Sequence, residues 1–199
     1  MKRKERAAET EAALKAAAKR VFAERGYLAT KITDITAEAG RAAGSFYNHF
    51  GSKEALLEAL MADMAAESDT VAAEPGHLKD FTDPEAVRQH VAAYIRHYRE
   101  HVVTIRAVQQ AALVNEEFAA TVDRRAAAEA NDILDHVTAV TDAGRSLPGP
   151  PELAVRMAFG LVHTFLQSWR QQFDALTDDE VTEALTRFVY RGLNGCDYA

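Results

Sequence analysis

The chain has few of the residues that cross-link or interrupt a fold. Cysteine occurs once, at Cys196, so no disulfide can form within the chain. A single thiol three positions before the end of the sequence is interpreted as incidental rather than as a redox sensor. Only 5 of 199 residues are proline and 10 are glycine, which leaves long stretches free of helix breakers.

Long apolar stretches are missing as well. No run approaches the roughly 20 apolar residues that a membrane-spanning helix needs. Charged residues dominate the segment Met1–Arg6, where a signal peptide would require an apolar stretch. We therefore expect a soluble, cytoplasmic protein with no membrane partner.

Charge is unevenly distributed along the chain, whose net charge is −7. Residues 1–53 hold 11 basic and 6 acidic residues, whereas the remaining 146 hold 12 basic and 24 acidic ones. A basic N-terminal part on an acidic body suggests that only the N-terminal part meets a polyanion such as DNA. Chance asymmetry of solvated surface charge is the alternative.

The pattern of apolar residues predicts an all-α protein of about nine helices. A first helix is expected over 9–25, two short ones over 32–39 and 42–49, and a fourth that Ser52 caps. Residues 68–83 are expected to form a loop. Two or three helices are expected over 84–116 and one over 117–142, with a connector at 145–151. Thr177 begins a capping box that opens the last helix.

The two short helices are separated by a turn that contains Gly40. This spacing is typical of a helix-turn-helix, whose second helix enters the major groove of DNA. The second helix carries hydrogen-bonding side chains at Arg41, Ser45 and Asn48. Helices linked in this way also occur in proteins that never contact DNA, so the residue types favour DNA binding more than the spacing does.

The segments RGYLATKITDI (25–35) and AGRAAGSFYNHFGSKEAL (39–56) resemble the DNA-binding domain of the TetR family of transcriptional regulators. The resemblance covers roughly residues 9–65. It implies an N-terminal three-helix helix-turn-helix DNA-binding domain over 1–67, with its core at about 31–50. The remaining residues, 68–199, would form a C-terminal helical domain for ligand binding and dimerisation.

The resemblance also assigns roles to residues. Tyr47, His49 and Lys53 match positions that hold DNA phosphates, and Gly44 lets the helix approach the duplex. Phe46 and Phe50 are interpreted as core residues. The DNA-binding residues expected from the resemblance are Thr30, Lys31, Thr33, Arg41, Ala42, Ala43, Gly44, Ser45, Tyr47, Asn48, His49 and Lys53.

Two residues depart from the family pattern at the start of the recognition helix. Arg41 stands where a small apolar residue is usual, and Ala42 stands where Ser or Thr usually caps the helix. We expect the helix to begin without a side-chain cap, which contributes about 1 kcal/mol elsewhere. Base reading is expected to depend on Arg41, Ser45 and Asn48.

Apolar residues of the last two helices recur at helical spacing. The resemblance implies that they form a dimer interface built from two helices of each subunit; burial within one subunit is the alternative. The candidate interface residues are Val155, Phe159, Val162, Leu166, Phe173, Val181, Leu185 and Phe188.

The middle helices are expected to enclose a small-molecule pocket. His97 and His101 have the spacing of metal ligands, but no acidic or cysteine partner is evident nearby, so we expect no metal and no cofactor. The candidate pocket residues, many of which could instead belong to the core, are Tyr94, His97, Tyr98, His101, Gln109, Gln110, Leu113, Phe118, His163 and Trp169.

The function expected from the resemblance is ligand-responsive regulation of transcription. A homodimer would bind a palindromic operator in double-stranded DNA, and a small-molecule inducer would release it. Repression is usual in the family, and the sequence leaves activation open. The alternatives are a helical enzyme, for which no nucleophile–base pair or Gly-x-Ser-x-Gly motif is present, and a protein-interaction scaffold.

Overall fold

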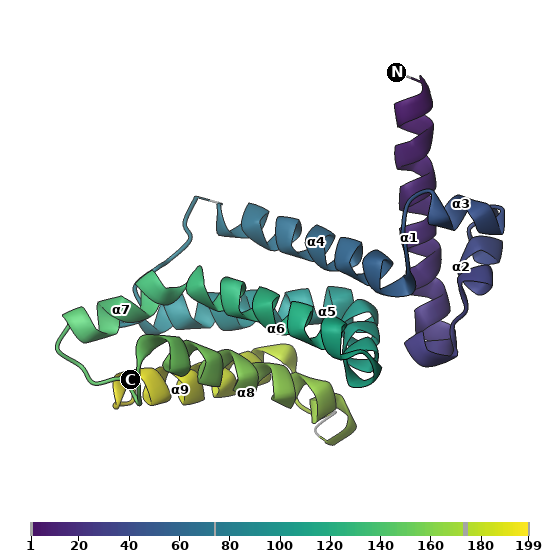
Figure 1. The fold of residues 1–199 in the computed structure, drawn as a ribbon. Helices are drawn as coiled ribbons and strands as arrows, with labels where there is room; N and C mark the ends of the chain where they lie inside the picture. The colour runs from purple at the N-terminus through teal and green to yellow at the C-terminus, as the bar shows by residue number, and fades with distance from the viewer. Residues whose placement is uncertain (1, 74, 173–174, 199) are drawn as a thin grey trace. The chain divides into compact units, whose positions relative to one another are not determined.

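The computed structural model describes residues 2–73, 75–172 and 175–198, of which 2, 3, 71, 72 and 169–172 are described by their backbone alone. In these ranges the chain forms nine helices and no strand, which confirms the predicted all-α fold (Figure 1). The helices are α1 (Lys2–Ala29), α2 (Ile32–Glu38), α3 (Ala43–Tyr47), α4 (Lys53–Ala72), α5 (Pro84–Val114), α6 (Glu116–Asn131), α7 (Leu134–Asp142), α8 (Pro151–Gln172) and α9 (Asp178–Asn194). No helix in the described part of the chain has the length and apolarity that a membrane crossing requires.

Several helices are longer than the sequence pattern predicted. Helix α1 begins at Lys2 instead of near residue 9, and α4 continues to Ala72. Residues 84–114 form one helix instead of two or three, because no Gly or Pro follows Pro84 within this stretch. The predicted helix over 117–142 is instead two, α6 and α7, which are separated at Asp132 and Ile133.

The chain divides into two compact units. Unit 1 comprises Met1–Val71 and His101–Asp123, and unit 2 comprises Ala72–Glu100 and Arg124–Ala199. Unit 1 is thus larger than the predicted N-terminal segment 1–67, because it includes the C-terminal part of α5 and the N-terminal part of α6.

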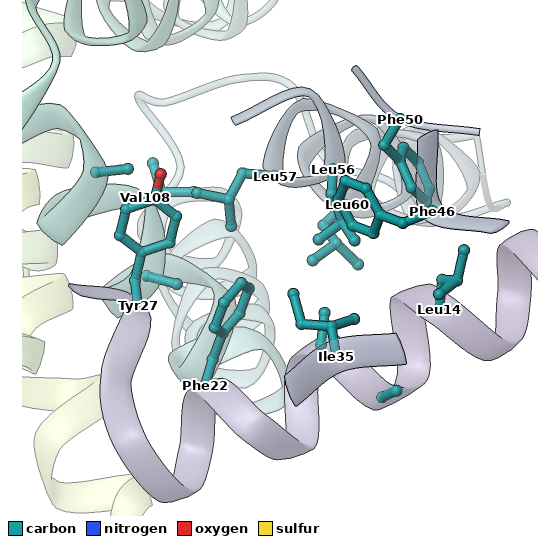
Figure 2. Close-up of a cluster of buried hydrophobic side chains, with 14 of the residues drawn as sticks. Leu14, Phe22, Tyr27, Ile35, Phe46, Phe50, Leu56, Leu57, Leu60 and Val108 are labelled. Carbon is teal, nitrogen blue, oxygen red and sulfur yellow. The ribbon is translucent and has the colours of Figure 1, made fainter. Parts of the chain in front are cut away.

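Unit 1 is built around a core that gathers side chains from all of its helices (Figure 2). Helices α2 and α3 have only seven and five residues, too few to be stable alone. Each inserts one fully buried side chain into this core, Ile35 from α2 and Phe46 from α3. Leu14 of α1 and Leu56 of α4 pack in the same cluster. The position of α3 therefore depends on packing against α1 and α4.

The predicted helix caps agree with the structure at two positions. The Ser52 hydroxyl accepts a hydrogen bond from the backbone N–H of Ala55 in the first turn of α4, at 3.1 Å. At the start of α9, Thr177 and Glu180 form a reciprocal capping box. In unit 2, α9 buries Val181, Leu185 and Val189.

Candidate nucleic-acid interface and internal cavity

Helix α3 presents two contrasting faces within unit 1. Phe46 and Phe50 are buried in the core, as predicted. Tyr47, with 62% of its surface exposed, and the exposed Gly44 and Asn48 lie on the opposite side. The helix thus offers a solvent-facing surface with little side-chain bulk at Gly44, which suits close contact with another molecule.

The start of α3 has no side-chain cap, as expected from Ala42. The backbone N–H of Arg41, in the turn before α3, donates to the carbonyl of Thr36 in α2, at 2.9 Å. The Arg41 guanidinium lies 3.4 Å from the carboxylate of Glu9 in α1. The side chain of Glu9 is 74% exposed and that of Arg41 is 36% exposed, so this surface ion pair is weak and the guanidinium can change partners.

Lys53 is held inside unit 1 rather than directed only to solvent. Its Nζ donates hydrogen bonds to the carbonyls of Tyr27 and Thr30, at 3.0 Å and 2.7 Å, and lies 4.1 Å from the centre of the Tyr27 ring. Burial lowers the pKa of the Lys53 ammonium, against the opposing effect of Glu54. The ammonium group therefore links residues 27–30 to α4 through hydrogen bonds. Contact with a phosphate remains a prediction.

Thr30 does not present its hydroxyl at the surface, contrary to the expected contact with DNA. The residue is buried, and its Oγ1 donates to the carbonyl of Gly26 at 2.7 Å. Lys31 and Thr33 are exposed near the start of α2, and Ala42 and Ala43 are exposed at the start of α3. Ser45 is half-buried. His49 is also half-buried, with Nδ1 4.0 Å from the Glu11 carboxylate.

The part of the chain that carries this surface is similar to a known family. Residues 14–60 match the family described as bacterial regulatory proteins, tetR family. In this range the sequence is similar to that of TetR-family regulators. The matched range contains α2, α3 and most of the unit 1 core, and so covers the surface described above.

The TetR relatives with curated names match over short stretches. The repressor DhaR of Mycobacterium sp. (strain GP1) is 61% identical over 36 residues, 18% of this chain and 18% of DhaR. The regulator TtgR of Pseudomonas putida is 38% identical over 81 residues, 41% of this chain and 38% of TtgR. These matches cover less than half the length of each relative.

The TetR fold, by contrast, extends over nearly the whole chain. The transcriptional regulator FadR from Bacillus subtilis, whose structure holds stearoyl-CoA, superposes with a TM-score of 0.69. The superposition covers 90% of this chain and 97% of FadR at 19% identity. Similarity at this level of identity establishes the shared fold.

Unit 2 contains a small apolar cavity. Its volume of about 20 Å³ is room for one water. Tyr94 borders it, and the Tyr94 hydroxyl lies 2.9 Å from Nδ1 of His163. Burial lowers the pKa of His163 and raises that of Tyr94, so both groups are neutral near pH 7. The lining residues are Phe81, Val87, His90, Val91, Tyr94, Ala158, Phe159, Val162 and Val189.

The structure separates the candidate pocket residues into different places. Tyr94 lines the cavity of unit 2, His163 is bonded to it, and the buried Tyr98 ring packs edge-on against His163. His97 is half-buried in the same unit. The Trp169 side chain lies outside the described residues.

The other pocket candidates belong to unit 1, and several are corrected by the structure. Gln110 hydrogen-bonds the backbone of Tyr27, and Phe118 is part of the hydrophobic core. Leu113 is 83% exposed, Gln109 is half-buried, and His101 is buried with Nε2 2.9 Å from the Glu67 carboxylate. Helical spacing correctly predicted that these residues lie in helices. It did not predict that they belong to unit 1, whereas the cavity lies in unit 2.

The predicted dimer residues also require correction. Five of them are buried within this single chain: Val155, Val162, Leu166, Val181 and Leu185. Phe159 borders the cavity, and Phe173 lies outside the described residues. Phe188 alone among the described candidates is largely exposed, at 62%. Periodicity identifies a buried face, and here most of that face packs against the chain's own helices.

Two further groups of residues belong to these surfaces. Phe81, Val87, Val91, Ala158 and Val189 line the cavity but carry no signal beyond ordinary apolar spacing. Leu153 and Met157 of α8 are exposed apolar residues. Together with Gly160 they follow a spacing of four and then three residues, which is typical of one helix face. This spacing could have indicated a second apolar face on α8.

Proposed function

We propose that this chain is a transcriptional repressor that binds operator DNA through the exposed surface of α3. The two faces of α3 carry this proposal. Buried Phe46 fixes the helix, while Gly44, Tyr47 and Asn48 remain exposed for phosphates and base edges. Arg41, which forms a weak surface ion pair with Glu9, lies beside them just before the start of α3.

The charge of the N-terminal part supports a polyanionic partner. Residues 1–53 contain an excess of five basic residues, whereas the rest of the chain is acidic. Exposed Lys4, Arg6 and Lys31 add to the positive potential near this end of the sequence. Such a distribution strengthens binding to DNA at low salt and weakens it as salt rises.

The cavity of unit 2 supports control by a mostly apolar ligand with one hydrogen-bonding group. Apolar side chains form most of its wall, and the Tyr94–His163 pair supplies a neutral donor and acceptor. The space is too small for such a ligand, so binding requires the surrounding helices to move. A ligand that binds the expanded conformation better would shift the population toward it. The stearoyl-CoA held by FadR is consistent with an apolar ligand class.

A homodimer would use the exposed faces of α8 and α9. Leu153, Met157 and Gly160 share one face of α8, and Phe188 and Gly192 share one face of α9. Large apolar side chains beside glycines allow two helices to pack closely. Two copies related by a two-fold axis would present two α3 helices to a palindromic operator.

Binding to the DNA that flanks the protein's own gene tests the proposal. Fluorescence anisotropy at fixed salt would compare the wild type with Tyr47→Ala and Asn48→Ala. Each substitution should weaken specific binding by about 1–3 kcal/mol, because a contact to a charged phosphate or a base edge is lost. Leu113→Ala, at an exposed position on α5, is the matched control and should bind normally. Equal affinity of all variants, or no preference over unrelated DNA, would refute the proposal.

A further inference from the structure

Three histidines that are distant in sequence converge in unit 2. His77 lies in the segment before α5, His90 lies in α5, and His136 lies in α7. One nitrogen of each ring lies within 4.8 Å of the other two, and the Nε2 atoms of His77 and His136 are 3.0 Å apart. The ring of buried Phe81 packs edge-on against His90 and His136 and closes one side of the cluster.

Hydrogen bonds fix the orientation of two of the three rings. Nδ1 of His90 lies 2.8 Å from the carbonyl of Ala86, and Nδ1 of His136 lies 2.5 Å from the Asp135 carboxylate. Both partners only accept, so each Nδ1 carries a proton and each Nε2 is left as the ligand atom. Nε2 of His136 faces Nε2 of His77 at 3.0 Å.

The lone pair of His90 is unsatisfied. Nε2 is buried, and no group among the described residues forms a hydrogen bond with it. A buried polar atom without a partner destabilises a fold unless something else binds it. A cation at the centre of the cluster would bind this nitrogen and the Nε2 of His136 together.

The segment that carries His77 is held in place by its neighbours. The Gln89 side chain accepts a hydrogen bond from the N–H of Leu78 at 2.8 Å and donates one to the carbonyl of Gly76 at 3.1 Å. It thus binds the backbone on both sides of His77. The N–H of Phe81 donates to the carbonyl of His136 at 3.3 Å. These bonds join the loop, α5 and α7 around the cluster.

We propose that His77, His90 and His136 form a binding site for a divalent transition-metal ion of the zinc class. Imidazole nitrogens suit such ions, whereas magnesium and calcium prefer oxygen ligands. Tetrahedral zinc with bonds of about 2.0–2.1 Å places its ligand nitrogens about 3.4 Å apart. This value lies between the 3.0 Å that separates His77 from His136 and the 4.8 Å within which all three nitrogens lie. The Ala86 carbonyl and the Asp135 carboxylate orient the ligating rings as outer partners do in known sites. Half-exposed His77 leaves a fourth position open to water or another small ligand. The inference rests on these side chains and does not depend on DNA binding.

Metal titration of the full-length chain without an affinity tag tests this site. Chelator-treated protein would be titrated with Zn²⁺ by calorimetry and with Co²⁺ by visible absorption. One ion per chain and the intense bands of four-coordinate Co²⁺ are expected. His77→Ala, at a half-exposed loop position, should keep the fold and weaken Zn²⁺ binding more than about tenfold. Asp135→Asn should weaken it by about 10–100-fold, since it orients His136.

Matched variants separate this site from other ligands in the chain. His97→Ala and His163→Ala remove imidazoles elsewhere in unit 2, and Cys196→Ser removes the exposed thiol. All three should bind one Zn²⁺ with wild-type affinity. Zn²⁺ should also raise the melting temperature of the wild type but not of His77→Ala. Unchanged Zn²⁺ affinity in His77→Ala, or a pale six-coordinate Co²⁺ spectrum, would overturn the proposal, whatever the outcome of the DNA-binding measurements.

Discussion

The side-chain oxygen of Gln110 accepts a hydrogen bond of 2.8 Å from the backbone N–H of Tyr27. The bond compensates for a break in α1, where Gly26 adopts a positive φ of 72° and interrupts the regular helix. The turn that follows carries Tyr27 and Thr30, whose carbonyls accept from Lys53. A residue expected to bind a ligand thus secures the backbone that leads into α2.

Replacement of Gln110 by alanine should destabilise unit 1. The N–H of Tyr27 would lose its partner in a buried setting, which costs about 1–3 kcal/mol. Urea unfolding followed by circular dichroism would measure the loss. Gln167→Ala, at an exposed position of α8, is the control and should change the free energy of unfolding by less than about 0.5 kcal/mol. Equal stabilities of the two variants would contradict the structural role of Gln110.

The hydrogen bond between Tyr27 and Glu54 should make stability depend on pH. The Tyr27 hydroxyl donates to the Glu54 carboxylate at 2.5 Å. Burial alone would raise the pKa of Glu54, but hydrogen bonds from Tyr27, its own backbone N–H and Ser52 lower it below the ordinary 4.5. A lowered folded-state pKa stabilises the fold above the unfolded value, and this contribution disappears as the pH falls through the folded value.

Tyr27→Phe provides the test of that dependence. At pH 7 the variant should be less stable than the wild type by about 1 kcal/mol, because a hydrogen bond to a charged group is lost. The difference should shrink as the pH drops below 4.5, where Glu54 becomes protonated. Unfolding free energies measured from pH 3 to pH 7 would show it. A constant difference across the range would refute this pH dependence.

Arg41 and Glu9 should have opposite effects on operator binding. Arg41→Ala should weaken binding by more than about 1 kcal/mol, because a base or phosphate contact is lost. Glu9→Gln should tighten binding, since it releases the guanidinium and removes a negative charge near the DNA. Neither should alter thermal stability much, because exposed ion pairs contribute little.

A matched arginine provides the control for that comparison. Arg88 forms an exposed ion pair with Glu85 at 3.8 Å in α5 of unit 2. Arg88→Ala removes the same charge and should leave operator affinity near the wild-type value at equal salt. An equal loss in Arg88→Ala and Arg41→Ala would mean that total charge, and not the position at α3, determines binding.

The exposed face of α8 and α9 should control the oligomeric state. Phe188→Glu and Met157→Glu place a charge where the proposed homodimer buries apolar surface, which should shift the protein to monomers. Sedimentation velocity would measure the change, and operator affinity should fall with it. Val114→Glu, at another exposed apolar position in unit 1, should leave the wild-type state unchanged. A monomeric wild type that binds the operator fully would rule out the dimer.

Local signals made much of unit 1 predictable. Phe46, Phe50 and the uncapped start at Ala42 are as predicted, because each follows from short-range spacing and capping chemistry. The same spacing misled in unit 2. Val162 and Leu185 have the period of a helix face that packs against another helix, and periodicity does not distinguish a helix of the same chain from one of a second copy.

The sequence by itself determined the all-α fold and the recognition motif, since helical periodicity, caps and the order of residues 25–56 are properties of neighbouring residues. Tertiary structure alone decided that Gln110 bonds Tyr27 and that Thr30 faces inward. It also brought His77, His90 and His136 together. These contacts join residues tens of positions apart, and only the packing of whole helices determines which such side chains meet.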